Sequence, residues 1–199
     1  MEKYYSFKNQ ITNTIIIKKS EFITNLINVT TEDEITTTLK AIKKKYYDAT
    51  HNCYAYIIGT QADIKYKASD DGEPSKTAGA PILDCLQKNN LTNCLCVVTR
   101  YFGGIKLGAG GLTRAYSDSA SETIKLITDL EEIIEKKLIT IQISYELLSV
   151  ITKAMAPYTL INKTFAESIT LTYEVPLHIE GDVIKTITNI TNGKAIFPK

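Results

Sequence analysis

Residues 93–128 read NCLCVVTRYFGGIKLGAGGLTRAYSDSASETIKLIT, and the strand, loop and helix that they predict lie at the centre of the chain's architecture. The stretch opens with an apolar run rich in Cys and Val, which indicates a buried strand. A glycine-rich loop follows, and then an Ala- and Ser-rich pattern with helical periodicity. Half of the chain's 10 glycines lie in this loop: Gly103, Gly104, Gly108, Gly110 and Gly111. Such a backbone permits positive φ and leaves amide groups open to a ligand at the start of a helix.

The glycine-rich loop is flanked by basic residues and contains no acid, so we predict that it binds an anion or RNA. Arg100, Lys106 and Arg114 supply charged donors. The loop is not a P-loop, because it contains no Gly-Lys-Ser/Thr, and it is not a dinucleotide fingerprint, because Thr113 stands where the third glycine would be. The alternative is a tight turn whose glycines only allow two elements to pack closely.

Two aromatic residues follow Arg100 and offer rings for stacking on a base. Side chains alternate along a strand, so Tyr101 and Phe102 are expected on opposite faces. At most one of them then faces a ligand, and the other belongs to the core. We include Tyr101 in the predicted site.

The turn SDDGEP, residues 69–74, places the carboxylates of Asp70, Asp71 and Glu73 within four residues. They could hold Mg²⁺ through a ligand phosphate or act as an acid–base pair. They could also simply form a turn in which Asp caps its own backbone. A third role is to pair with Arg100 or Arg114, and we therefore expect this turn to lie close to the glycine-rich loop.

His51 and Asn52 precede a predicted strand and are candidates for a supporting role at the same site. A nucleophilic pair of His51 with a cysteine is the less favoured alternative. The Cys-x-Cys and His-x-Cys spacings are shorter than those of zinc sites, so we predict no metal and no cofactor. The four cysteines fit buried thiols without disulfides: Cys53, Cys85, Cys94 and Cys96.

The composition is that of an ordinary globular protein of 199 residues, with 44% hydrophobic and 23% charged residues. The formal net charge is +1, which excludes a strongly basic nucleic-acid binder, so any RNA contact must come from a local patch. No apolar run is long enough for a membrane span, and the first residues lack the apolar core of a signal peptide. We therefore expect a cytoplasmic protein without membrane contact.

The pattern predicts an α+β chain with two domains, residues 1–130 and 131–199. In the first, a T-x-x-E capping box at Thr31 and Glu34 starts a helix, and Thr77 is the expected N-cap of another. Strands are expected within 14–29, with a joint at 18–20, and at 53–59 and 64–70. The acidic stretch 129–135 is expected to be a linker or a helix end. Beyond it we predict a βαββαβ order with strands at 138–144, 160–166, 169–175 and 195–197, and helices at 146–156 and 182–190.

Three motifs in this order resemble the signature of the IMPACT family: ATHNCYAY (49–56), SDDGEPSKTAGAPIL (69–83) and TRYFGGIKLGAGGLTRAYS (99–117). The resemblance implies an N-terminal domain like domain IV of elongation factor G, with a ribosomal-protein-type βα fold. In bacterial members it also implies a ferredoxin-like C-terminal domain like domain V of that factor. The segment EVPLHIEGDVIKTITNITNGKAIF (174–197) resembles the end of elongation factor G.

Members of this family are associated with translational regulation, so the resemblance implies a non-enzymatic module that binds RNA, the ribosome or a regulatory protein. The alternative that we keep open is an enzyme or sensor acting on a small phosphorylated ligand held by the glycine-rich loop. No oligomeric state is predicted.

Overall fold

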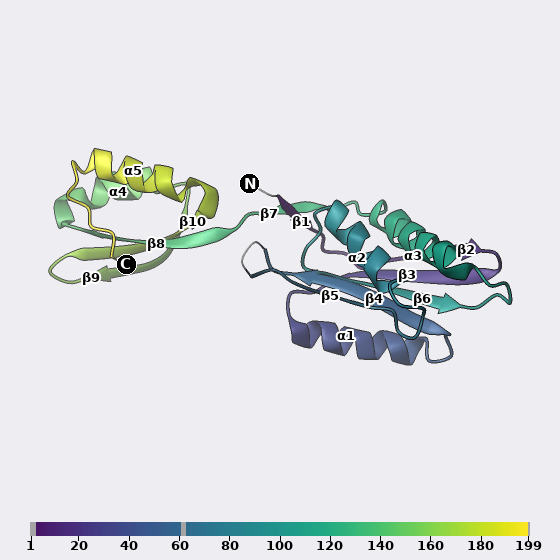
Figure 1. Cartoon of the computed structure of the whole chain (residues 1–199). Helices are drawn as coiled ribbons and strands as arrows, with labels where there is room; N and C mark the ends of the chain where they lie inside the picture. Colours follow the sequence, from purple (N-terminus) through teal and green to yellow (C-terminus); the bar gives the residue numbers. More distant parts are fainter. Residues whose placement is uncertain (1–2, 61–62, 199) are drawn as a thin grey trace. The chain divides into compact units, whose positions relative to one another are not determined.

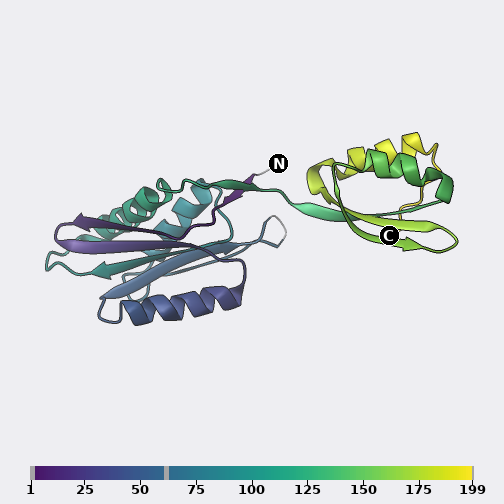
Figure 2. The same ribbon diagram turned by 180° about the vertical axis from the view of Figure 1, so that it is seen from behind.

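The structure, a computed structural model, describes residues 3–60 and 63–198, and the chain divides into two compact units (Figures 1 and 2). The first unit is Met1–Ile133 and the second is Ile134–Lys199. Both combine helices with antiparallel strands, so the expected α+β class is confirmed. In the described parts of the chain, no helix is both long enough and apolar enough to cross a bilayer.

The first unit is built on an antiparallel sheet with the order β2-β3-β6-β4-β5. The central strand β6 is buried along its length except at its last residue, because both faces of the sheet are covered. This confirms the buried strand expected at the start of the glycine-rich stretch. The strands expected on either side of residues 18–20 are also present. The strand bounds are β2 (Ile11–Ile17), β3 (Ser20–Asn28), β4 (His51–Ile58), β5 (Lys65–Ser69) and β6 (Cys94–Tyr101).

One helix covers one face of this sheet and two cover the other, as Figure 1 shows for α1 (Glu32–Lys45), α2 (Gly79–Lys88) and α3 (Gly108–Ile124). The helix α1 begins at the predicted capping box, in which the side chains of Thr31 and Glu34 each accept from the other's backbone amide. Its apolar side packs on Leu95 and Val97 of β6. The opposite face carries the larger core, which includes Phe22, Leu26, Ile82, Leu86 and Tyr116.

Two local predictions about the helices are wrong. The helix α3 already begins at Gly108, so three of the five loop glycines lie in its first turn. Glycine has a low helix propensity, but the packing of Leu112 and Ala115 on the sheet outweighs it. Thr77 is not the N-cap of α2. The backbone amides of Ala78 and Gly79 instead donate to the carboxylate of Asp70, which lies at the end of the preceding strand.

The acidic stretch 129–135 is not a plain linker, because it contains the strand β7 (Glu131–Ile133). This strand pairs with β1 (Tyr4–Ser6). Lys8 binds the side chain of Glu131, and the backbone amides of Lys8 and Asn9 donate to the carboxylate of Asp129. The segment after β1 therefore binds the acidic side chains of Asp129 and Glu131, and β7 belongs to the first unit. The chain passes from the first unit to the second after Ile133, three residues beyond the expected boundary.

The second unit has the strand order β8-β10-β9, with its two helices on one face of the sheet (Figure 1). A 3₁₀ turn precedes each helix. The last predicted strand, at 195–197, is reduced to a single bridge between Ile196 and Gln142 of β8. The elements are β8 (Lys136–Ile143), η2 (Tyr145–Leu147), α4 (Leu148–Ala154), β9 (Thr159–Phe165), β10 (Ile169–Pro176), η3 (Leu177–Ile179) and α5 (Glu180–Ile190).

Candidate functional site

A cavity of about 350 Å³ lies beside the glycine-rich loop of the first unit. The end of β6, the loop and the first turns of α3 contribute Arg100, Phe102, Lys106, Leu107, Gly108, Ala109 and Leu112 to its wall. The start of β4 and the acidic turn contribute Thr50, His51 and Pro74. The cavity therefore brings four of the predicted site residues together: His51, Arg100, Lys106 and Gly108.

Arg100 lies in the wall of the cavity with its side chain almost fully buried. Its Nη1 donates to Oε1 of Glu73 at 2.6 Å. The guanidinium lies over two aromatic rings, 5.6 Å from the centroid of Phe22 and 5.5 Å from that of Phe102. Its Nε has no hydrogen-bond partner in the described residues. The buried cation therefore keeps donors that no described residue uses.

Glu73 is a buried carboxylate whose charge is balanced by Arg100. Besides Arg100, the hydroxyl of Tyr116 donates to Oε1 at 2.8 Å, and Nε2 of His51 lies 3.9 Å from Oε2. Burial, together with the neighbouring Cys53 and Glu73, raises the pKa of Tyr116 far above its usual value. The tyrosine hydroxyl therefore stays protonated and acts as a donor. These contacts anchor the acidic turn against β6.

The orientation of His51 is set by the backbone of the acidic turn. Its Nδ1 lies 2.9 Å from the carbonyl oxygen of Asp71, which can only accept, so Nδ1 carries the proton. Nε2 is then the ring atom that remains for Glu73 and for the cavity. The turn approaches the ring closely because Asp71 and Gly72 both adopt positive φ, 43° and 91°.

The other two carboxylates of the acidic turn serve the fold and, like Glu73, do not line the cavity. Burial acts to raise the pKa of Asp70, but hydrogen bonds from the amides of Lys76, Gly79 and Ala78 outweigh it and lower that pKa below its usual value. Asp71 accepts from the amide of Asn52 at 2.7 Å and pairs with Lys43 at 2.6 Å. In the described residues no group of three or more His, Cys, Asp or Glu side chains is placed to hold a metal ion.

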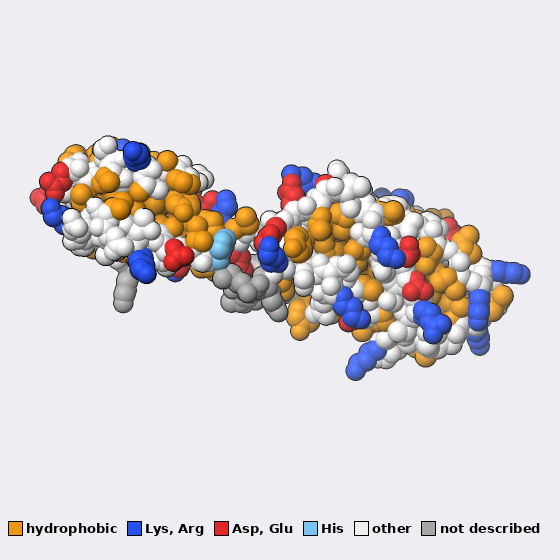
Figure 3. Space-filling view, turned by 90° about the horizontal axis from the view of Figure 1, so that it is seen from above, with side chains coloured by type: hydrophobic (Ala, Val, Ile, Leu, Met, Phe, Trp, Pro, Cys, Tyr) orange, Lys and Arg blue, Asp and Glu red, His pale blue; other side chains and the backbone are white. Residues whose placement is uncertain are grey.

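Four exposed cations lie in the loop, in the adjoining β2–β3 turn and in the second turn of α3, and we call them the basic rim: Lys18, Lys19, Lys106 and Arg114. Their side chains form no hydrogen bond or ion pair with any residue that the structure describes. Lys18 and Lys19 form the β2–β3 turn, which touches the loop because the amide of Gly103 donates to Oγ of Ser20 at 3.2 Å. Figure 3 shows Lys and Arg side chains gathered at this end of the first unit, on the right of the view.

The first turn of α3 leaves its backbone accessible. No side chain caps the helix, and its first turn contains no acid. A Cβ added at Gly108 or Gly110 would meet nothing within 4 Å, so the protein's own packing does not require glycine at Gly110. The space beside this helix start is therefore open, and amides at the start of a helix are the groups that attract an anion.

Several predicted residues lie outside the cavity. Tyr101 donates its hydroxyl to Asp48 at 2.8 Å, and this bond raises the pKa of Tyr101 to about 12, whereas its neighbour Phe102 lines the cavity. Arg114 lies on the basic rim, and Asn52 accepts from Thr99 inside the sheet. Of the two rings considered for stacking, Tyr101 was chosen, whereas Phe102 is the one that lines the cavity. Sequence reasoning missed Lys18 and Lys19. The Lys-Lys joint between two β-rich runs was the available signal for both.

The cysteines lie in the core and are poor nucleophiles. All four are buried, and burial raises the pKa of Cys53 and of Cys94 to about 12. Thiols with such pKa values stay protonated at neutral pH, and only the thiolate attacks. Cys53 also donates to the carbonyl oxygen of Asp70. The alternative of a Cys–His nucleophile is therefore not favoured.

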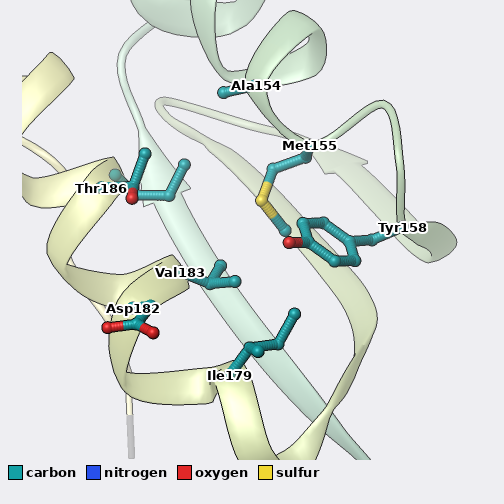
Figure 4. Close-up of a pocket in the computed structure, with 8 residues that line it drawn as sticks. Ala154, Met155, Tyr158, Ile179, Asp182, Val183 and Thr186 are labelled. Atoms are coloured by element: carbon teal, nitrogen blue, oxygen red, sulfur yellow. The ribbon is translucent and has the colours of Figure 1, made fainter.

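A second cavity, of about 190 Å³, lies between α4 and α5 of the second unit. Figure 4 shows Met155 and Tyr158 on one side of it, facing Ile179 and Val183, with the carboxylate of Asp182 nearby. No Lys, Arg or His lines this cavity. Its apolar wall with one acid does not suit an anion, so the first unit holds the candidate site.

Comparison with known proteins places the chain in a family. A protein-family model described as the Impact N-terminal domain matches residues 18–124, more than half of the chain. The chain is 49% identical over 141 residues to the IMPACT family member YvyE of Bacillus subtilis, covering 71% of this chain and 63% of that relative. It is 36% identical over 159 residues to an IMPACT family member of Haemophilus influenzae, covering 79% and 77% of the two chains.

A solved structure of a hypothetical protein matches with a TM-score of 0.67 at 27% identity, covering 99% of this chain and 97% of that one. The fold match thus extends over both units, whereas the matched part of the chain spans less than two thirds of the Bacillus relative's length. The three sequence motifs, the family match over the first unit and these relatives agree, and the chain belongs to the IMPACT family.

Proposed function

We propose that the protein is a translation-associated regulatory module whose first unit binds RNA, free or within the ribosome, through its phosphates. The observation that carries this proposal is the basic rim, four exposed cations that have no acidic partner among the described residues, together with the uncapped start of α3. The family's association with translation supports the RNA part of the proposal. A cytoplasmic location follows from the same association.

The electrostatics of the first unit suit a local contact. The net charge of the whole chain is only +1, so no general positive field attracts a polyanion. The basic rim instead concentrates positive charge at one end of the unit. Salt screens the attraction between an exposed cation and a phosphate beyond roughly 8–10 Å, so the rim acts on phosphates close to it. Helix amides at Gly108 and Ala109 add directed donors. Such a surface binds a phosphate backbone without reading its bases.

We also propose that the two units correspond to two domains of elongation-factor type. The first would resemble domain IV of elongation factor G. The second would be a ferredoxin-like domain resembling domain V. The strand order of the second unit supports this, because the bridge from Ile196 extends it to Ile196–β8–β10–β9, the order of a βαββαβ split motif.

Removal of two rim cations tests the proposal. We expect Lys106→Ala/Arg114→Ala to weaken binding to single-stranded RNA and to reduce the slope of log K against log salt by about 0.7 for each lost phosphate contact. The measurement is a salt titration of binding to a fluorescent oligouridylate, beside co-sedimentation with ribosomes.

Lys125→Ala is the matched control for this titration. Lys125 is an exposed cation at the other end of the same helix, and it pairs with Glu122 at 2.7 Å. It should leave both affinity and slope unchanged. An unchanged slope in the double variant, or an equal loss in the control, would contradict binding through the basic rim.

Gly110→Ala should separate stability from binding. Alanine at this helical position fills open space and should raise the free energy of unfolding by about 0.5–1 kcal/mol. The same methyl group stands beside the open amides, so RNA binding should weaken. Urea unfolding and the salt titration measure the two effects.

Gly181→Ala provides the comparison, because Gly181 lies in the first turn of α5, also with open space around its Cβ position. It should stabilise the protein without changing RNA binding. If Gly110→Ala instead destabilises the fold, the glycine has a packing role and the open-amide argument is wrong.

A second candidate function is an enzyme or sensor for a small phosphorylated ligand. The observation that favours it is the cavity at the loop, whose volume of about 350 Å³ falls within the range of small-molecule sites. The cavity offers no activated nucleophile, since Cys53 lies in the core with a raised pKa. Binding is therefore better supported than covalent catalysis.

A further inference from the structure

We infer that the cavity beside the glycine-rich loop binds a terminal phosphomonoester, while the basic rim binds internal phosphates. The group would be the end phosphate of an RNA strand or that of a free mononucleotide. For the end phosphate of RNA, this inference rests on the proposed RNA binding. For a free mononucleotide, it is independent of that proposal.

Arg100 has donors that no residue of the described chain uses. The residue is only 5% exposed, lines the cavity, and its Nε has no partner in the described chain. A buried donor without an acceptor costs free energy, which an entering anion would recover. Nη1 donates to Glu73 and Nη2 to Ser20, and each of these nitrogens carries a second N–H, so Arg100 keeps donors for a ligand.

Phe102 places an aromatic ring beside this guanidinium. The ring lies over the guanidinium of Arg100, is 47% exposed and lines the cavity. It therefore offers a face on which the base that adjoins a bound phosphate stacks. The apolar walls supplied by Leu107 and Leu112 suit the same base.

The size of the cavity and its donors favour a terminal phosphate. A cavity of about 350 Å³ has room for one nucleotide and is small for a strand that continues in both directions. A terminal phosphate also carries about −1.5 to −2 charges and three free oxygens. Arg100, Lys106 and Gly108 line the cavity and supply donors for these oxygens, and Lys106 is the one residue that the cavity shares with the basic rim.

His51 adds a reason to prefer a monoester over a diester. Its Nδ1 is committed to the carbonyl of Asp71, and Nε2 remains. When neutral, Nε2 accepts a hydrogen bond from the P–OH of a monoanionic phosphomonoester, and when protonated it donates to the dianion. An internal diester has no P–OH and offers only the second of these contacts.

The test compares short oligouridylates that carry a 5′-phosphate, a 3′-phosphate or hydroxyl groups at both ends, together with uridine monophosphate and uridine. The chain contains no Trp, so Phe102→Trp supplies a single fluorescent reporter at the cavity. We expect phosphorylated probes to bind at least about tenfold more tightly than their hydroxyl counterparts, the loss expected for one charge-assisted hydrogen bond. Calorimetry on the unmodified protein should show the same preference.

Two variants separate the cavity from the basic rim. His51→Leu should abolish the preference for phosphorylated probes and keep the salt slope, and urea unfolding verifies its fold. Lys19→Gln should flatten the salt slope and keep the preference. Arg100 is not used for this purpose because its loss would leave Glu73 buried without a counter-charge.

The outcomes distinguish the two proposals. Equal binding of phosphorylated and hydroxyl-ended probes, with an intact salt slope, overturns the cavity inference and leaves RNA binding in place. Tight binding of uridine monophosphate without any binding of oligouridylates supports the cavity and overturns the RNA function. A preference that His51→Leu retains contradicts the assignment to this cavity.

Discussion

Replacing Arg100 by Met is expected to lower the free energy of unfolding by about 3–5 kcal/mol, the cost of leaving a buried charge unpaired. Arg100 and Glu73 are 5% and 8% exposed, and their side chains meet at 2.6 Å. Without the guanidinium, Glu73 keeps only the hydroxyl of Tyr116 and the more distant His51. Urea unfolding followed by circular dichroism measures the loss.

The double variant Arg100→Met/Glu73→Gln provides the control. It removes both charges and retains most of the volume, so it should recover more than half of the lost stability. Tyr116→Phe should cost about 1–3 kcal/mol, because it withdraws one donor from the same carboxylate. A loss below about 1 kcal/mol in Arg100→Met would show that the ion pair is not the anchor of the acidic turn.

Gly103→Ala is expected to cost about 3 kcal/mol, at the upper end of the overpacking range, because the added methyl group meets backbone that cannot rotate away. The Cβ would overlap the carbonyl group of Lys19 and the amide of Ser20. The β2–β3 turn would have to move away from the loop, carrying Lys18 and Lys19 with it. Chemical denaturation measures the loss, and RNA binding should fall with it.

Gly104→Ala is the neighbouring comparison. Its φ of 85° strains any L residue, but a Cβ there meets nothing within 4 Å. The expected cost is about 1–2 kcal/mol, from backbone strain alone. Equal costs for the two variants would mean that the turn yields readily, and the close approach of β2–β3 to the loop would then not be a rigid contact.

Local signals in the sequence predicted the local structure. The capping box at Thr31 and Glu34 located the start of α1, and alternation or continuous apolar runs located the strands of the two larger sheets but not β1 and β7. The same reasoning failed where the residue that caps a helix is not the residue next to the helix start. Thr77 is the residue that a local rule selects as the cap of α2, yet Asp70 accepts the amides from across the turn.

Charge and glycine content predicted which segments form the candidate site, but not the contacts between their side chains. The acidic turn was expected near the glycine-rich loop, and the structure brings Glu73 against Arg100. The pairing of Asp71 with Lys43 depends on sheet register. The position of Lys18 and Lys19 beside the loop depends on the contact of Gly103 with the β2–β3 turn. No pattern within a short window encodes such contacts, because the partners lie far apart in the chain.

The pairing of β1 with β7 means that the polypeptide enters and leaves the first unit at one two-stranded ribbon. The first and last strands of the unit lie side by side. Domains of this kind tolerate insertion into other chains and circular permutation, because neither changes the path through the core. The first unit is therefore suited to act as a transferable module. Whatever chain continues beyond β7 is attached at the same ribbon that holds the unit's beginning.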